Sequence, residues 1–241
     1  QEGPDRKWPL LINLHGADRN VDIENIHHAY LPYLIDSGKE LPMVVVNPVC
    51  NKRRWNVDEL DHMLDEILER YNVDPDRVYL SGFSMGGYGT WDWVFQDPGR
   101  FAAISPIAGC AYPSDLERAW RVRNVPIWII HGERDTTVEI GCSHEAVEAL
   151  DRYGADVRTT FHPDMGHKLE DIWGGTLTDD DWYGWLLAQD RGHNKARGIP
   201  LDRKMQRRYV GTYRAIGEQG ARIEIFRRKG RLHARLEKAE H

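Results

Sequence analysis

Short apolar runs alternate along most of the chain with segments in which apolar residues recur every three or four positions. The runs predict buried strands, and the periodic segments predict amphipathic helices. The predicted strands are Trp8–Leu14, Met43–Val46, Arg77–Leu80, Phe101–Ile107, Pro126–Ile130 and Val157–Phe161. The predicted helices follow Asn56, follow the turn Gly82–Gly87, run from Ser143 to Tyr153, and cover Asp180–Gln189. This alternation predicts an α/β fold, with a mostly parallel sheet flanked by helices on both faces.

The pattern changes near residue 190. Tyr209–Tyr213, Arg222–Phe226 and Arg231–Leu236 alternate apolar and polar residues, which predicts a small antiparallel β-meander. Residues 1–189 carry 17 Lys and Arg against 32 Asp and Glu, a net charge of −15, whereas residues 190–241 have a net charge of +9. We therefore predict a main domain over residues 1–190 and a basic linker with a β appendage over residues 191–241. Three strands are too few to be stable alone, so we expect the appendage to dock on the main domain or to belong to a larger module.

Composition narrows the function classes. The chain has 241 residues, of which 41% are hydrophobic and 29% charged, as in globular proteins. Its longest apolar run, around Ile127–Ile130, is far shorter than the roughly 18 residues that a membrane helix needs. The net charge of −6 argues against a nucleic-acid partner. The residues carry no indication of the oligomeric state.

The three cysteines lack the C-x-x-C spacing of a zinc cluster. One disulfide with one free thiol and three free thiols both fit the sequence; we expect free thiols, and Cys50 is the least expected member of any disulfide. The sequence begins at Gln1 rather than Met, which we interpret as the mark of a processed chain. A secreted or periplasmic location is therefore expected rather than a cytoplasmic one.

One motif indicates nucleophilic catalysis. Gly82-Phe83-Ser84-Met85-Gly86 fits G-x-S-x-G and lies between a predicted strand and a predicted helix. That context distinguishes a nucleophile turn from an ordinary glycine-rich loop, because the sharp turn exposes the serine hydroxyl at the edge of the sheet. Ser84 is the predicted nucleophile.

A serine nucleophile requires a base, and the base requires an orienting carboxylate. In folds with this motif the order along the chain is Ser, Asp or Glu, then His. Asp135 follows a buried strand and is the predicted acid, with Glu133 as its rival. His167 follows the last strand and is the predicted base, with His162 as its rival.

Acyl transfer also needs two backbone N–H groups to bind the oxyanion. Met85 directly follows the nucleophile, and Ala17 lies in the loop after the first strand, Leu14-His15-Gly16-Ala17-Asp18. We predict Ala17 and Met85 as the oxyanion hole and assign His15 a structural role in that loop.

These segments together resemble one family. The chain is similar to α/β-hydrolases of the group that includes polyhydroxybutyrate depolymerases, feruloyl and acetylxylan esterases, and the single-domain peptidase-like relatives of prolyl oligopeptidases. The matching segments are Pro9–Asp18, Asn47–Trp55, Tyr71–Trp91, Phe101–Gly109, Pro126–Thr136 and Gly166–Arg191. The chain departs from the group after Ala17, at Asp18-Arg19-Asn20, and after His167, at Lys168-Leu169. Both departures fall at the expected substrate rim.

The resemblance implies the α/β-hydrolase fold and extends the candidate site. Trp55 falls where these esterases place an aromatic residue near the acyl pocket, although it could equally cap the following helix. Asp18 and Trp173 are further candidates for substrate binding, and aromatic walls would suit sugar-linked or aromatic esters.

We therefore expect a serine carboxylic-ester hydrolase that acts through an acyl-enzyme, on carbohydrate-linked, aromatic or short-chain esters, with no cofactor and no metal. The expected partner is a small-molecule or polysaccharide-linked ester. The alternatives are a small serine peptidase with the same triad and a non-catalytic hydrolase-like binding module.

Overall fold

The computed structural model describes residues 6–17, 30–168, 180–192, 207, 209–214, 222–228 and 231–237. The chain divides into two compact units, Gln1–Arg197 and Gly198–His241. This division lies seven residues beyond the boundary drawn from charge and composition. The reason is that Arg191 still belongs to the first unit: its backbone N–H donates to Asp76 O at 2.8 Å, and its guanidinium donates to Asp76 Oδ1 at 2.8 Å.

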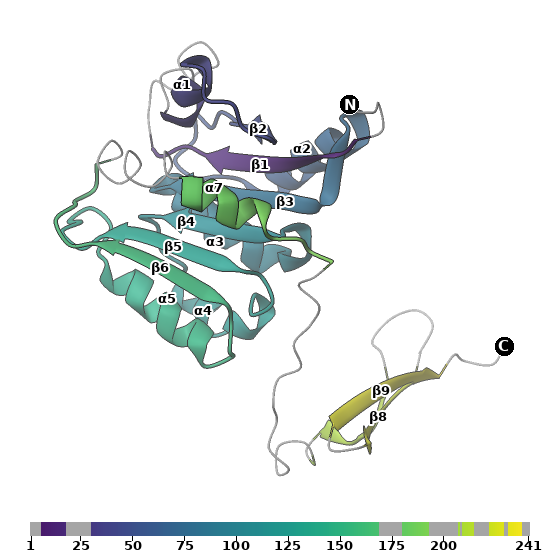
Figure 1. Cartoon of the computed structure of the whole chain (residues 1–241). Coiled ribbons are helices and arrows are strands. Elements are labelled where there is room, and N and C mark those ends of the chain that lie inside the picture. Colours follow the sequence, from purple (N-terminus) through teal and green to yellow (C-terminus); the bar gives the residue numbers. More distant parts are fainter. Residues whose placement is uncertain are drawn as a thin grey trace. The chain divides into compact units, whose positions relative to one another are not determined.

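A six-stranded parallel sheet forms the centre of the first unit, in the order β2-β1-β3-β4-β5-β6 (Figure 1). The strands are β1 Trp8–Leu14, β2 Val44–Val46, β3 Val73–Phe83, β4 Ala103–Ile107, β5 Ile127–Gly132 and β6 Val157–His162. β1 and β5 are buried along almost their whole length on both faces, which accounts for their largely apolar sequences. Since all six strands are parallel, their carboxyl ends meet at one edge of the sheet.

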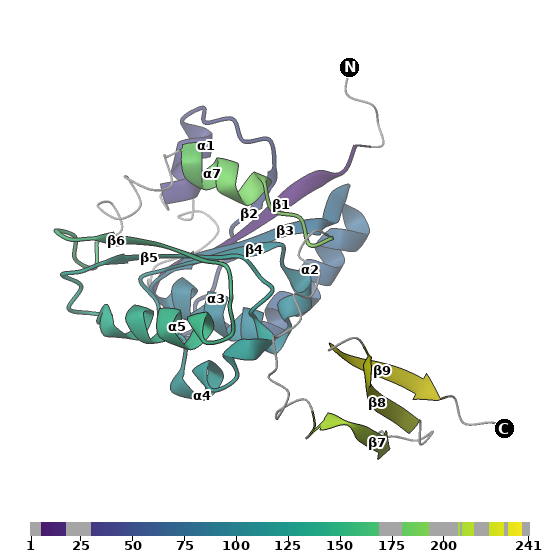
Figure 2. The same ribbon diagram turned by 60° about the horizontal axis from the view of Figure 1, so that its bottom comes forward.

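Helices cover both faces of this sheet. Figure 2 shows α2, α3, α4 and α5 on one side and α1 and α7 on the other. Their bounds are α1 Tyr30–Asp36, α2 Val57–Arg70, α3 Met85–Gln96, α4 Pro113–Leu116, α5 Gly141–Asp151 and α7 Asp180–Leu187, with short 3₁₀ turns at Pro98–Arg100 and Ala119–Arg121. Asn56 caps the start of α2, because its side chain accepts from Asp58 N and Glu59 N. The predicted fold class is confirmed.

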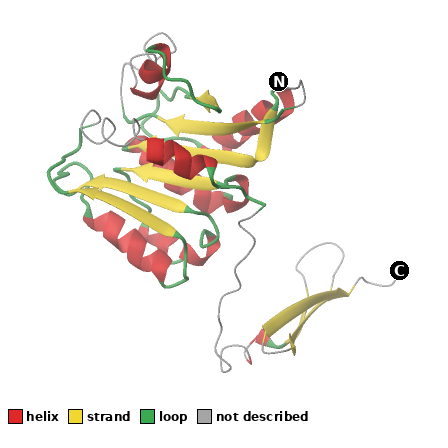
Figure 3. Ribbon diagram, in the orientation of Figure 1, coloured by secondary structure: helices red, strands yellow, loops and turns green. Residues whose placement is uncertain are grey.

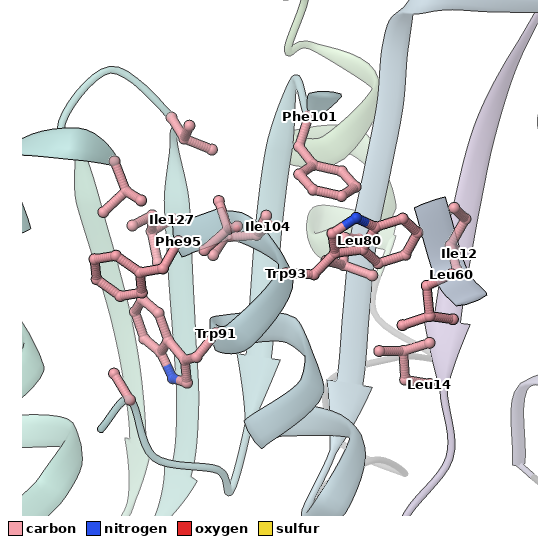
Figure 4. Close-up of a cluster of buried hydrophobic side chains, with 14 of the residues drawn as sticks. Ile12, Leu14, Leu60, Leu80, Trp91, Trp93, Phe95, Phe101, Ile104 and Ile127 are labelled. Atoms are coloured by element: carbon pink, nitrogen blue, oxygen red, sulfur yellow. The ribbon is translucent and has the colours of Figure 1, made fainter. Parts of the chain in front are cut away.

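Two hydrophobic cores lie on either side of the sheet. In the core under α3, Trp91, Trp93 and Phe95 pack against strand residues such as Ile104 and Ile127 (Figure 4). On the other face, Leu11, Tyr79 and Trp182 are fully buried in a second cluster. Because successive strand residues point to opposite faces, the strands supply both cores. This packing holds the carboxyl edge of the sheet as a rigid platform.

The second unit contains a three-stranded antiparallel sheet in the order β7-β8-β9 (Figure 3). Its strands are β7 Gly211–Arg214, β8 Arg222–Arg228 and β9 Arg231–Glu237. Ile223 is paired in register with Leu236, and Ile225 with Ala234. This confirms the predicted meander. Docking of the appendage on the main domain stays a prediction.

The expectation of three free thiols is wrong. Cys110 and Cys142 form a disulfide with a Cα–Cα distance of 5.5 Å, and Cys50 is the free, buried cysteine. Cys110 follows β4, and Cys142 lies in the first turn of α5, the helix that follows β5. Since β4 and β5 are neighbours, the segments after their carboxyl ends lie side by side. The sequence pattern contains the strands but not this neighbour relation.

No helix within the described ranges is long and apolar enough to cross a membrane.

Candidate active site

Ser84 lies at the sharp turn between β3 and α3, at the carboxyl edge of the sheet. Its φ of 53° and ψ of −115° place it in a conformation that non-glycine residues rarely adopt. The turn is tight, because a Cβ on Gly82 would lie 2.4 Å from Gly86 O, and a Cβ on Gly86 would lie 1.9 Å from Leu14 O. The glycines of the motif are therefore required by space, and the turn between them holds Ser84 in a strained backbone conformation.

The structure brings Ser84, His167 and Asp135 into one hydrogen-bonded chain. His167 Nε2 lies 2.8 Å from Ser84 Oγ, and His167 Nδ1 lies 2.5 Å from Asp135 Oδ2. An ionised carboxylate only accepts, so Nδ1 carries the proton and Nε2 is left to accept from the serine hydroxyl. Phe83 stacks on the imidazole, with ring centroids 4.9 Å apart, and further restrains its orientation.

Asp135 is held on both oxygens. Oδ1 accepts from the backbone N–H groups of Thr137 and Val138, each at 2.8 Å, and Oδ2 faces His167. Burial by itself would raise the pKa of Asp135, but the hydrogen bonds from Val138, His167 and Thr137 hold that pKa below its ordinary value. The carboxyl group is therefore ionised near neutral pH and can stabilise a positive charge on His167.

The two rival residues lie elsewhere. Glu133 is exposed, and its backbone N–H donates to His162 O at 2.9 Å. His162 is a residue of β6, where it is paired in register with Gly132. Burial lowers the pKa of His162, which favours its neutral form. The two rivals thus connect the loop that carries Asp135, which we call the acid loop, to the end of β6.

The loop after β1 lies beside the nucleophile. A Cβ on Gly16 would lie 3.5 Å from Ser84 Cβ. Ala17, the next residue, is exposed. Met85 is the first residue of α3, so its N–H has no acceptor within the helix. The two predicted oxyanion donors thus lie beside the nucleophile in the chain or in space. Ala17 follows Gly16, which lies close to Ser84, and Met85 follows Ser84 itself.

His15 and Trp55 hold the loop after β1 in place through hydrogen bonds. His15 is buried, and its Nε2 accepts from Cys50 N at 2.9 Å, so its proton resides on Nδ1, which donates to Gly16 O at 2.6 Å. Trp55 Nε1 donates to His15 O at 3.3 Å, and the two rings meet edge to face. Trp55 is only 5% exposed, so it has little surface to offer a substrate. Asp18 and Trp173 lie outside the described residues.

Sequence reasoning missed a second histidine beside the acid. His131 is the penultimate residue of β5 and is fully buried. Its Nε2 lies 2.8 Å from Val138 O and 3.3 Å from Asp135 Oδ2, and its Nδ1 lies 2.8 Å from Ser143 Oγ. A polar residue at the end of a wholly apolar strand, four positions before the acid, was the available signal.

Over the ranges that the structure describes, no three His, Cys, Asp or Glu side chains are grouped so that they could hold a metal ion.

Comparison with known proteins places these residues in a family. The profile of the phospholipase/carboxylesterase family matches residues 52–172, which is half of the chain. The chain is 33% identical over 135 residues to a bifunctional acetylxylan esterase/xylanase of Neocallimastix patriciarum, covering 53% of this chain and 19% of that protein. It is 24% identical over 208 residues to the uncharacterized peptidase YuxL of Bacillus subtilis (strain 168), covering 67% of this chain and 31% of the relative.

A solved thermostable esterase has a similar structure, with a TM-score of 0.65 and 27% identity over 78% of this chain and 56% of the esterase. The chain spans about a fifth to a third of the length of the two curated relatives.

Proposed function

The chain belongs to the phospholipase/carboxylesterase family, and from this premise we propose that it is a serine carboxylic-ester hydrolase that works through an acyl-enzyme. The observation that carries the proposal is the chain of two hydrogen bonds from Ser84 through His167 to Asp135, at 2.8 and 2.5 Å. The strained backbone at Ser84 supports the same reading, because strain of this kind is retained where a side chain must be presented for chemistry.

The first half-reaction forms the acyl-enzyme. Ser84 Oγ bonds to the ester carbonyl carbon while His167 Nε2 accepts the hydroxyl proton. The carbonyl π electrons move to the oxygen, which the N–H groups of Ala17 and Met85 would bind. When the tetrahedral intermediate collapses, the bond to the alcohol oxygen breaks, and His167 returns the proton to that alcohol. Asp135 orients the imidazole and stabilises its positive charge throughout.

The second half-reaction releases the acid. Water attacks the acyl carbon as His167 accepts one of its protons, the bond to Ser84 Oγ breaks, and the proton returns to the serine. Every proton transfer passes through His167 Nε2, which already lies 2.8 Å from the serine oxygen.

We assign the remaining residues supporting roles. Trp55 holds the carbonyl of His15 and thereby positions the loop that carries Ala17. Asp18 and Trp173 remain candidates for contact with substrate on sequence grounds. Carbohydrate-linked, aromatic or short-chain esters are the proposed substrates, supported by the names of the relatives, which include an acetylxylan esterase and cutinases.

A secreted or periplasmic location is proposed with the activity. The support is the disulfide between Cys110 and Cys142, because disulfides persist in oxidising compartments and are rare in the cytosol.

The proposal is tested with matched ester and amide substrates. Wild-type protein should hydrolyse p-nitrophenyl acetate, and Ser84→Ala should lower kcat by about 10⁴-fold or more while leaving the melting temperature nearly unchanged. Ser81→Ala is the matched control, since Ser81 is buried within β3 and donates to Ser105 O. A Ser84→Ala protein with wild-type activity would refute the assignment.

A small serine peptidase is the second candidate, favoured by the similarity to YuxL. A p-nitroanilide with the same acyl group distinguishes the two, because an amide demands protonation of a much poorer leaving group. We expect much faster hydrolysis of the ester, and preference for the anilide or for peptides would favour the peptidase. Absence of turnover on both, with a folded protein, would favour the binding module.

A further inference from the structure

His131 is buried against the acid without belonging to the Ser84–His167–Asp135 chain. Its side chain is fully inaccessible, and it is held at three points: by Ser143 Oγ on Nδ1, and by Val138 O and Asp135 Oδ2 on Nε2. Burying an imidazole is costly unless its nitrogens are satisfied. The Nε2 atom of this buried histidine is therefore satisfied by contacts with the acid loop.

The contacts define which nitrogen carries the proton. Val138 O is a carbonyl and only accepts, so Nε2 of His131 must donate to it over 2.8 Å. Burial lowers the pKa of His131, so the ring is neutral and its other nitrogen, Nδ1, accepts from the Ser143 hydroxyl. The Nε2–H bond is therefore directed at Val138 O, with Asp135 Oδ2 3.3 Å from the same nitrogen.

These bonds close a ring around the carboxylate. Val138 N donates to Asp135 Oδ1 at 2.8 Å, Val138 O accepts from His131, and the same His131 nitrogen faces Asp135 Oδ2. Rotation of the carboxylate about its Cβ–Cγ bond would break contacts on both oxygens. On the basis of the proposed function, we propose that His131 is a positioning residue that sets the plane of the Asp135 carboxylate and limits its pull on the proton of His167.

The direction of the effect follows from the groups around the ring. Among the described residues, the titratable groups near this ring of hydrogen bonds are Asp135 of the acid loop, His167 of the loop after β6, and Tyr88 of α3. The pKa of Tyr88 is raised by burial and by the nearby Tyr112 and Asp135. The positive end of the Nε2–H dipole lies close to Asp135 Oδ2, which is 3.3 Å from Nε2, and partly offsets the negative charge that His167 feels. Without this dipole the carboxylate would hold a protonated His167 more strongly.

Two amide substitutions distinguish the contacts of His131 Nε2 from the contact of its Nδ1. In His131→Gln the amide nitrogen can take the place of Nε2 and still donate toward Val138 and Asp135. In His131→Asn the shorter amide can reach only the place of Nδ1, beside Ser143. Ser143→Ala is the matched control, because it removes the contact on Nδ1 and leaves Nε2–H in place.

The readout is the pH profile of kcat/KM, with concentrations corrected by active-site titration. The acidic limb of that profile reports protonation of the free enzyme's base. We expect His131→Asn to move this limb upward by roughly 0.5 pH unit and to lower kcat about 10- to 100-fold with little change in KM. His131→Gln and Ser143→Ala should keep the limb within about 0.2 pH unit of wild type.

The outcomes are distinct. A folded His131→Asn protein with an unmoved limb and normal kcat per titrated site would overturn the positioning role, whereas an inactive wild-type protein would instead overturn the proposed function. Imidazole ¹⁵N NMR of wild-type protein gives a second test that needs no variant. It should show His131 neutral with its proton on Nε2 from pH 6 to 8, and a proton on Nδ1 would overturn the inference.

Discussion

The disulfide offers the sharpest test of what stabilises the catalytic unit. It joins Cys110, after β4, to Cys142, in α5, across a sequence separation of 32 residues. Closing a loop of that length in the unfolded chain costs about 3.7 kcal/mol of conformational entropy at 25 °C. Both cysteines are only half-buried, so replacing them with alanine adds little loss of packing. Cys110→Ala/Cys142→Ala should therefore lower the free energy of unfolding by about 3–4 kcal/mol.

In a thermal scan this loss corresponds to a melting temperature lower by roughly 6–16 °C for a unit of this size. Cys50→Ala, which keeps the disulfide, is the control. Thiol titration in denaturant should find one thiol before reduction and three after it, since Cys50 alone is free. A double variant that melts within about 2 °C of wild type would refute the loop-entropy argument, and three thiols before reduction would refute the disulfide itself.

Three further predictions concern the acid, the nucleophile turn and the extent of the catalytic unit. Asp135→Asn should lower kcat about 10⁴-fold, whereas Glu133→Gln should change it little; equal losses would contradict the assignment. Because the pKa of Asp135 is lowered by folding, its ionisation stabilises the protein above about pH 4, and the stability difference between wild type and Asp135→Asn should shrink as the pH falls below that value. Gly86→Ala should prevent formation of the turn, since its Cβ would lie 1.9 Å from a β1 carbonyl, while Gly184→Ala, with open space around it, should fold normally; circular dichroism and labelling of Ser84 distinguish them. A chain ending at Arg197 should keep hydrolysis of a small ester, because the first unit contains Ser84, Asp135 and His167; loss of activity with retained folding would assign the β appendage a catalytic role.

Local constraints explain what could be predicted from the sequence. Gly82 and Gly86 are required by contacts within one turn and with β1, so the motif around Ser84 carries its own geometry. The apolar strands predict a parallel sheet, and in a parallel sheet the carboxyl ends of β3, β5 and β6 lie at one edge. Asp135 and His167 follow two of those strands, and chain order was therefore enough to nominate them.

The rest depended on which segments become neighbours. Cys110 and Cys142 meet only because β4 lies beside β5, which the sequence pattern does not state. In the sequence, His131 looks like an ordinary residue near the end of a strand. Its contact with Asp135 forms only when the loop that carries Asp135 folds back over the end of β5. The sequence placed Trp55 near the acyl pocket or at the start of the following helix, and its burial against His15 depends on how the loops after β1 and β2 pack together.

The central claim is that Ser84 is a nucleophile activated by His167, and covalent labelling tests it most directly. Wild-type protein treated with a fluorophosphonate should gain one phosphonyl group, and peptide mass spectrometry should locate it on Ser84. The rate of labelling should be lowered by orders of magnitude in His167→Ala. A label on Ser81 or Ser105, or a labelling rate that His167→Ala leaves unchanged, would contradict the account.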